Sequence, residues 1–208
     1  MRRTAVLGAA VLSTGLAVAC AATTATSKDV KAHAPLVGCG GPRARVKTLT
    51  DALAGKVSTT PKETTVAALR RLRVPRGLTR RSPRQQGAER TTYKVQARMV
   101  ETALEKDGDI RLVILDPKTK GKLAAEFPAP GCTRDASAEN RTRMRSARRA
   151  LIAACGMPAR TGSEVGGNAA ITGVGFFERG DGADRESRNG FELHPVLGFE
   201  GKCLLGAG

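Results

Sequence analysis

Four acidic residues and one histidine form the strongest candidate for a chemical site in this chain. Asp107 and Asp109 flank a glycine, Asp181 lies in a later Gly-rich loop, and Glu192 and His194 alternate near the C-terminus. Carboxylate oxygens are the ligands that Ca²⁺ prefers, and a histidine can serve as a general base. The residue types predict a ligand-binding site with no catalytic residue and no metal or cofactor, calcium being the one ion that they would suit.

These residues also have structural explanations. An Asp-Gly-Asp run is a common hairpin turn, because glycine accepts a positive φ and aspartate tolerates it. A single histidine on a half-exposed strand, such as His194, more often packs than reacts. The sequence therefore favours binding over catalysis and leaves enzymatic activity open.

The sequence lacks the residues that several classes of catalysis and binding require. The chain has two histidines and no serine-centred nucleophile elbow, which argues against a Ser-His-Asp hydrolase. It has no phosphate-binding glycine loop followed by Lys-Ser or Lys-Thr. One Tyr, five Phe and no Trp provide no evident platform for stacking single-stranded bases.

The hydrophobic periodicity predicts five strands and one long helix. Apolar and polar residues alternate from Tyr93 to Met99, and the phase changes at Val100, which predicts a bulge. The later strands and the helix are expected at Ile110–Leu115, Lys122–Phe127, Ser137–Cys155 (helix), Ala169–Phe177 and Gly190–Phe199.

This β-β-β-α-β-β order is that of an OB-fold, a five-stranded, partly open barrel. The prediction is a mainly β or α+β chain with a five-stranded OB-like barrel and a short N-terminal helical extension; a plain α+β sandwich fits the same order. In an OB-fold, the first hairpin loop and the loop between strands four and five flank the binding face. Asp107–Asp109 and Glu178–Asn189 are therefore expected to converge.

The N-terminal segment is typical of an export signal. Arg2 and Arg3 precede an apolar run that ends at Cys20, so residues 1–20 are predicted to be a signal peptide. Cys20 is either the lipid-bearing first residue of a lipoprotein or a residue close to ordinary signal-peptidase cleavage. The apolar run is too short to span a bilayer, and no later stretch is long enough. The mature chain is thus expected to be exported and to meet a membrane only through a lipid.

The remaining chain divides by composition. Residues 21–40 are predicted to be a tether, 41–90 an N-terminal extension with a basic linker, and 91–203 the OB-like domain. Within the extension, Pro61–Leu72 is expected to form a helix, and 73–90 a solvated segment. On the long helix, a basic outer face is expected from Arg141, Arg145, Arg148 and Arg149.

Four cysteines remain once Cys20 is set aside. Outside the cytoplasm, Cys39, Cys132, Cys155 and Cys203 are predicted to form two disulfides, with three pairings open. Their spacing does not fit a metal motif.

The charge favours an anionic partner. The formal net charge is +16, and loss of Arg2 and Arg3 reduces it to +14. Such a charge favours nucleic acid or an anionic surface polymer, and part of it can reflect codon bias instead.

Four separated segments resemble a group of uncharacterised exported bacterial proteins of actinobacterial and proteobacterial type. They are Cys39–Asp51, Glu105–Ile110, Ile171–Phe177 and Asn189–Leu197, the last reading NGFELHPVL. The resemblance implies export and a shared fold and brings no activity. This chain has Arg111 and Asp181 where that group usually has histidines.

A thinner similarity is to thermonuclease-type OB-folds, which also place Asp-Gly-Asp in the first hairpin. That resemblance implies that Asp107 or Asp109 helps to hold Ca²⁺. The Arg of the third strand and the acidic cluster after it have no clear counterparts near Leu123–Pro130.

The leading functional prediction is an exported, lipid-anchored, non-enzymatic domain that binds an anionic partner at the cell surface. One alternative is a Ca²⁺-dependent nuclease or phosphodiesterase that uses Asp107, Asp109, Glu192 and His194. The other alternative is a structural envelope protein without a small ligand.

Overall fold

The computed structural model describes residues 38, 39, 41, 43–178 and 186–205. The predicted signal peptide with Cys20, most of the predicted tether, and Asp181 lie outside the described residues.

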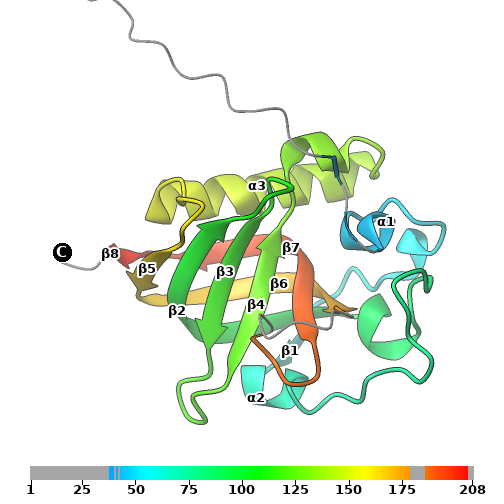
Figure 1. The fold of residues 1–208 in the computed structure, drawn as a ribbon, viewed down its shortest axis with the longest axis horizontal. Helices are drawn as coiled ribbons and strands as arrows, with labels where there is room; N and C mark the ends of the chain where they lie inside the picture. Colours follow the sequence, from blue (N-terminus) through cyan, green and yellow to red (C-terminus); the bar gives the residue numbers. More distant parts are fainter. Residues whose placement is uncertain (1–37, 40, 42, 179–185, 206–208) are drawn as a thin grey trace, which may run out of the picture. The chain divides into compact units, whose positions relative to one another are not determined.

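Five strands close into an OB-like barrel (Figure 1). β2 pairs with both β3 and β6, β3 with β4, β4 with β7, and β7 with β6. The β4–β7 pairing is parallel and the other four are antiparallel. Because the pairing returns to β2, the fold is a closed barrel and not an open sandwich. The barrel strands are β2 (Thr92–Leu104), β3 (Ile110–Leu115), β4 (Lys122–Phe127), β6 (Asn168–Phe177) and β7 (Phe191–Gly201).

Two irregularities bend the long strands. In β2 the register shifts between Met99 and Glu101, which confirms the bulge predicted from the change of phase. In β6 the register shifts on both sides of Gly173. A Cβ on the nearby Gly175 would lie 2.3 Å from the Ala88 carbonyl oxygen, so the backbones approach too closely there for any side chain.

The long helix α3 (Ala138–Cys155) packs against β7 and lies across one end of the barrel (Figure 1). The Ser137 hydroxyl accepts a hydrogen bond from the Asn140 N–H and caps the helix. Leu151 is fully buried against the barrel core. That core is built from the inward phase of the strands, including Leu112, Ile114, Leu123, Ala125, Phe127, Phe191 and Leu193.

The chain around the barrel holds three further short strands. β1 (Lys62–Thr64) pairs in parallel with β2, and β5 (Ser163–Gly166) pairs with β2 and with β8 (Leu204–Leu205). The predicted helix over Pro61–Leu72 is therefore wrong at its start. The polar residues 62–64 gain backbone partners along β2 instead, and helix α2 is only Val66–Leu69, capped by Thr65.

The N-terminal extension is tied to the barrel by buried charges. Arg43 precedes helix α1 (Ala44–Lys47) and forms an ion pair with Glu89, both side chains being almost wholly buried. Arg84 is buried too; it pairs with Asp51 and donates to the carbonyls of Val46 and Glu89. The prediction that 73–90 is solvated is therefore wrong at Arg84 and Glu89. Three 3₁₀ turns complete the described chain: Ala54–Lys56, Gly87–Arg90 and Pro130–Thr133.

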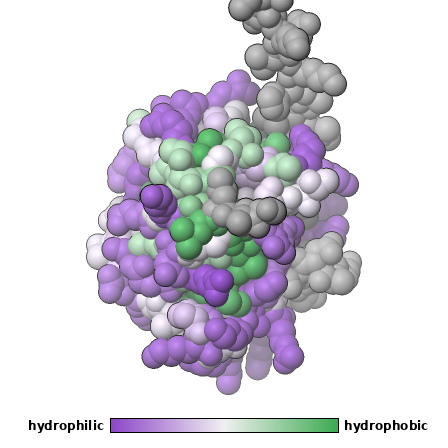
Figure 2. Space-filling view, turned by 90° about the vertical axis from the view of Figure 1, so that its left-hand side faces the viewer, coloured by the Kyte–Doolittle hydropathy of each residue, from purple (hydrophilic) through white to green (hydrophobic). Residues whose placement is uncertain are grey.

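The two predicted disulfides are present, with the pairings Cys39–Cys132 and Cys155–Cys203. Two disulfides are compatible with the predicted export. Over the described residues, no helix is long and apolar enough to cross a membrane. Figure 2 shows an apolar area within a mostly hydrophilic face on the side of β5 and β8; Leu204 and Met157 are large, exposed hydrophobic residues of the described chain.

Candidate functional site

A cleft of about 710 Å³ lies on the outer face of β3, β4 and β7, between the barrel and the N-terminal extension. Its floor comes from the outward phase of these strands, and Gly41 and Lys47 line it from the extension. In OB-folds the face of strands two and three is the usual binding surface. The cleft occupies that surface here.

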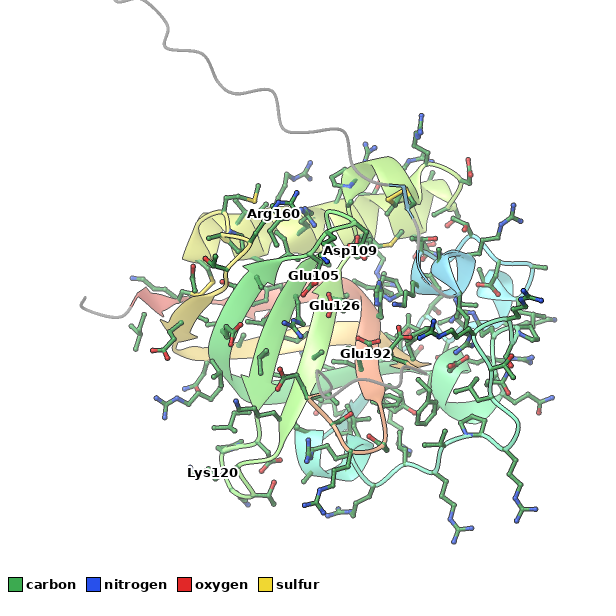
Figure 3. All side chains as sticks on the ribbon, in the orientation of Figure 1. Glu105, Asp109, Lys120, Glu126, Arg160 and Glu192 are labelled. Atoms are coloured by element: carbon green, nitrogen blue, oxygen red, sulfur yellow. A yellow bond between two sulfur atoms is a disulfide. The ribbon has the colours of Figure 1, made fainter. Side chains whose placement is uncertain are left out.

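Strand register places the charged residues of the floor side by side. Arg111 of β3 lies opposite Glu126 of β4, and Ala124 of β4 lies beside Glu192 of β7. Because side chains alternate along a strand, these residues point away from the barrel core. In Figure 3, Glu105, Asp109 and Glu126 lie close together and Glu192 lies on the neighbouring strand.

Four of the five predicted site residues line this one cleft: Asp107, Asp109, Glu192 and His194. The fifth, Asp181, is outside the described residues. The two predicted loops also meet, since Glu178, Glu186 and Ser187 line the same cleft. The structure thus brings the candidates together, and their binding of a ligand stays a prediction.

Asp107 and Asp109 have local partners that define the hairpin turn. Asp107 Oδ1 accepts a hydrogen bond from the Asp109 N–H, and Gly108 between them has φ 89°. Asp109 Oδ1 accepts from the Ala129 N–H at 2.7 Å, and its Oδ2 lies 3.4 Å from His194 Nε2. Both carboxylates therefore contribute to the local structure.

His194 and Glu192 are buried in the cleft, and each has a polar atom without a hydrogen-bond partner. His194 is 2% exposed and Glu192 is 8% exposed. Glu192 Oε1 and His194 Nδ1 lack a hydrogen-bond partner among the described residues, whereas His194 Nε2 faces Asp109 Oδ2. The His194 ring meets the ring of Phe176 edge-to-face at 5.8 Å. Buried polar atoms of this kind are costly unless something pairs with them, so the pair marks the part of the cleft where a ligand is expected.

Sequence reasoning missed several residues of the cleft, and two of them, Lys47 and Glu126, are charged and largely buried. Lys47 Nζ lies 2.5 Å from Glu178 Oε2 and 5.2 Å from the centre of the Phe176 ring. Glu126 is 7% exposed although it is charged. A lone glutamate in the apolar run of 122–127 was the one available signal for Glu126. No sequence pattern indicates Lys47, because its place depends on how the extension folds back.

Burial and like charges govern the ionisation of the two buried glutamates. Burial raises the pKa of Glu126 well above its usual value, and the charges of Glu192, Asp109 and Glu105 raise it further. Burial also raises the pKa of Glu192, against the opposing effect of Lys47 and His194. The cleft therefore holds protons on carboxyl groups at a pH at which exposed carboxyl groups are ionised.

The pKa values of Asp109 and Lys47 shift in the directions that favour their charged forms. Burial raises the pKa of Asp109, but the contact with His194, the Ala129 N–H and the charge of Lys47 outweigh it and hold the pKa below its usual value. Burial lowers the pKa of Lys47, but Glu192, Glu178 and Glu126 outweigh it and raise the pKa. Lys47 is thus a permanent cation at the edge of the cleft.

Among the described residues, the cleft offers no ready set of metal ligands. Over residues 43–178 and 186–205, no three histidine, cysteine, aspartate or glutamate side chains are placed to hold a metal. The carboxylates of Asp107 and Asp109 already accept backbone N–H groups. The calcium site that the thermonuclease-type resemblance implies therefore finds no support in this geometry.

Arg148 corrects the predicted basic face of the long helix. It is 7% exposed, and its guanidinium donates to the carbonyl oxygens of Phe127 and Gly108 at 2.7 and 2.9 Å. Its long side chain reaches from the helix to the hairpin turn, which a helical wheel cannot show. Arg145 and Arg149 are exposed as predicted, and Arg141 is half-buried.

The ionisation of Glu126 and Glu192 predicts how stability depends on pH. A carboxyl whose pKa is raised by folding destabilises the fold once it ionises, so stability should fall as the pH rises above the ordinary value of 4.5. Asp109 has the opposite effect, because folding lowers its pKa. Its contribution to stability is lost only as the pH falls below its ordinary pKa of 3.8.

We expect Glu126→Gln to raise Tm at pH 8 by about 2–4 °C and to have little effect at pH 5. Thermal unfolding followed by circular dichroism at the two pH values measures this, with the exposed Glu63→Gln as control; an equal shift at both would contradict it.

No protein-family model, curated protein or solved structure matches this chain.

Proposed function

We propose that this chain is an exported, lipid-anchored, non-enzymatic domain that binds an anionic polymer at the cell surface through its basic exterior. The observation that carries the proposal is the separation of charge over the described surface. Acidic side chains gather in the cleft, and the exposed charged side chains elsewhere are mostly basic.

Helix α3 carries exposed basic side chains that suit this role. Arg145 and Arg149 are exposed and lie one turn apart, about 6 Å along the axis. Arg134, before the helix, is exposed as well. Guanidinium groups bind phosphate oxygens in two-pronged geometry and remain charged at any physiological pH. A flexible polyanion would meet repeated positive charges along this face.

The cleft is not the place for that partner. Its seven carboxylates would repel phosphate groups, and two of its three basic side chains, Lys47 and Arg111, are already engaged by Glu178 and Glu105. No observation on the described residues favours the calcium-dependent phosphodiesterase as a second candidate, since the geometry offers no metal site.

Binding of duplex DNA and of a teichoic-type polymer tests the proposal. We expect both to bind the oxidised protein at low salt and to dissociate steeply as salt is added, because such binding is driven by release of counterions. Fluorescence anisotropy with labelled polymers measures the affinity. Absence of binding to both polymers at low salt would refute the proposal, and the structural envelope alternative would then stand.

A further inference from the structure

The cleft has the opposite charge to the chain that contains it. The chain carries a formal charge of +16, yet seven carboxylates line the cleft against three basic side chains. Among the described residues, the close charged contacts of the cleft are Lys47 with Glu178, Arg111 with Glu105, and His194 with Asp109. The carboxylates are Glu105, Asp107, Asp109, Glu126, Glu178, Glu186 and Glu192.

A second observation shows where a cationic partner would bind. Glu192 Oε1 is buried and has no hydrogen-bond partner among the described residues, and the same holds for His194 Nδ1, while His194 Nε2 faces Asp109. Both side chains line the cleft. A carboxylate oxygen is an acceptor, so a ligand group with N–H donors would pair with Glu192 Oε1.

Lys47 shows which kind of cation the cleft stabilises. Its ammonium group is held by Glu178 at 2.5 Å, over the Phe176 ring at 5.2 Å, and within the field of Glu192 and Glu126. These carboxylates more than offset the effect of burying the charge. The cleft therefore already accommodates one primary ammonium group, supplied by the protein itself.

We propose that the cleft binds a small ligand with several ammonium groups, such as a polyamine or a short lysine-rich peptide. One ammonium group lies against Glu192 and Glu126 beside Lys47. The others reach the carboxylates of the first hairpin at one end and Glu186 at the other. The volume of about 710 Å³ admits a ligand of this size. This site is separate from the basic exterior and does not depend on the polymer-binding function.

Binding of such a ligand releases a proton. Glu126 faces Arg111 and Lys47 as well as the acidic groups Glu192, Asp109 and Glu105, and its pKa is raised by burial and by those acidic groups. A bound ammonium group favours the ionised carboxylate and displaces the proton. Affinity therefore rises with pH as the pH approaches the raised pKa.

Isothermal titration calorimetry of the oxidised exported protein with spermidine, tri-lysine and calcium chloride tests the site. At low salt we expect the wild type to bind spermidine or tri-lysine more tightly at pH 8 than at pH 6. The comparison of these two probes shows whether a free polyamine or a peptide is preferred. Glu192→Gln should weaken binding about tenfold or more, because it removes a buried charged partner. Glu200→Gln, an exposed change on the same strand outside the cleft, should have no effect.

Lys47→Met is expected to strengthen binding, a result that a folding defect would not produce. It removes the internal ammonium group and keeps an apolar side chain over Phe176, so both amines should bind several-fold more tightly. The proposal is overturned if neither amine binds the wild type, if Glu192→Gln and Glu200→Gln bind equally, or if only calcium binds. Those outcomes leave polymer binding by the exterior unaffected, so the two proposals fail separately.

Discussion

Replacing Glu89 with alanine is expected to destabilise the folded protein by about 3–5 kcal/mol. Glu89 is fully buried and accepts hydrogen bonds from both terminal nitrogens of Arg43 and from the N–H groups of Gln85 and Phe177. Without it, the Arg43 guanidinium is left buried over the Phe176 ring, 4.7 Å from its centre, without a counter-charge. An unpaired buried charge is among the most damaging changes a fold can receive.

Urea unfolding of the oxidised protein measures this loss, with the exposed Glu63→Ala as the control, expected within about 0.5 kcal/mol of wild type. A loss below about 1 kcal/mol for Glu89→Ala would show that the ion pair does not anchor the extension. The consequence for function is direct, because Lys47 lies one turn beyond Arg43 and helps to wall the cleft.

Removing the Cys39–Cys132 disulfide is expected to cost about 4.6 kcal/mol. The two cysteines are separated by 93 residues, so the bond greatly restricts the unfolded chain. It also joins the start of the extension to the segment after β4, beside a small cavity that Asp107, Asp109 and Lys47 line too. Loss of the bond should therefore weaken binding in the cleft as well as stability.

The Cys155–Cys203 bond provides the matched comparison. It closes a separation of 48 residues, so its removal should cost only about 0.6 kcal/mol less by the same entropic argument. Neither of its cysteines lines the cleft. Paired cysteine-to-serine variants, unfolded in urea and titrated with spermidine, separate the two effects. Equal loss of amine binding in both variants would contradict the assigned role of Cys39–Cys132.

The barrel was predictable because its signals are local. The apolar runs 110–115 and 122–127 became strands at those bounds, and the change of phase after Met99 became a bulge. The long helix was expected at Ser137–Cys155 and is found at Ala138–Cys155, with Ser137 as its cap. Periodicity, capping and turn chemistry each act over a few residues, so one sequence reveals them.

Only part of the cleft could be predicted. The wall that the N-terminal extension forms depends on contacts between residues far apart in the sequence. The OB order correctly brought Asp109 near Glu192 and His194. The packing of Lys47 against Glu178 depends on Arg43–Glu89 and Cys39–Cys132, which join residues 46 and 93 positions apart. Arg148 was misplaced for the same reason, since its partners Gly108 and Phe127 are remote in sequence.

The salt dependence of polymer binding is the most direct test of the central claim that the basic exterior binds a polyanion. The slope of log K against log salt should become shallower by about 2 in Arg145→Gln/Arg149→Gln, since each lost phosphate contact removes about 0.9. The control Lys118→Gln/Lys120→Gln removes the same charge from an exposed turn, and Figure 3 shows Lys120 at the end of the molecule away from α3. Its slope should match the wild type. Equal slopes in all three proteins, or an equal change in both variants, would contradict the account.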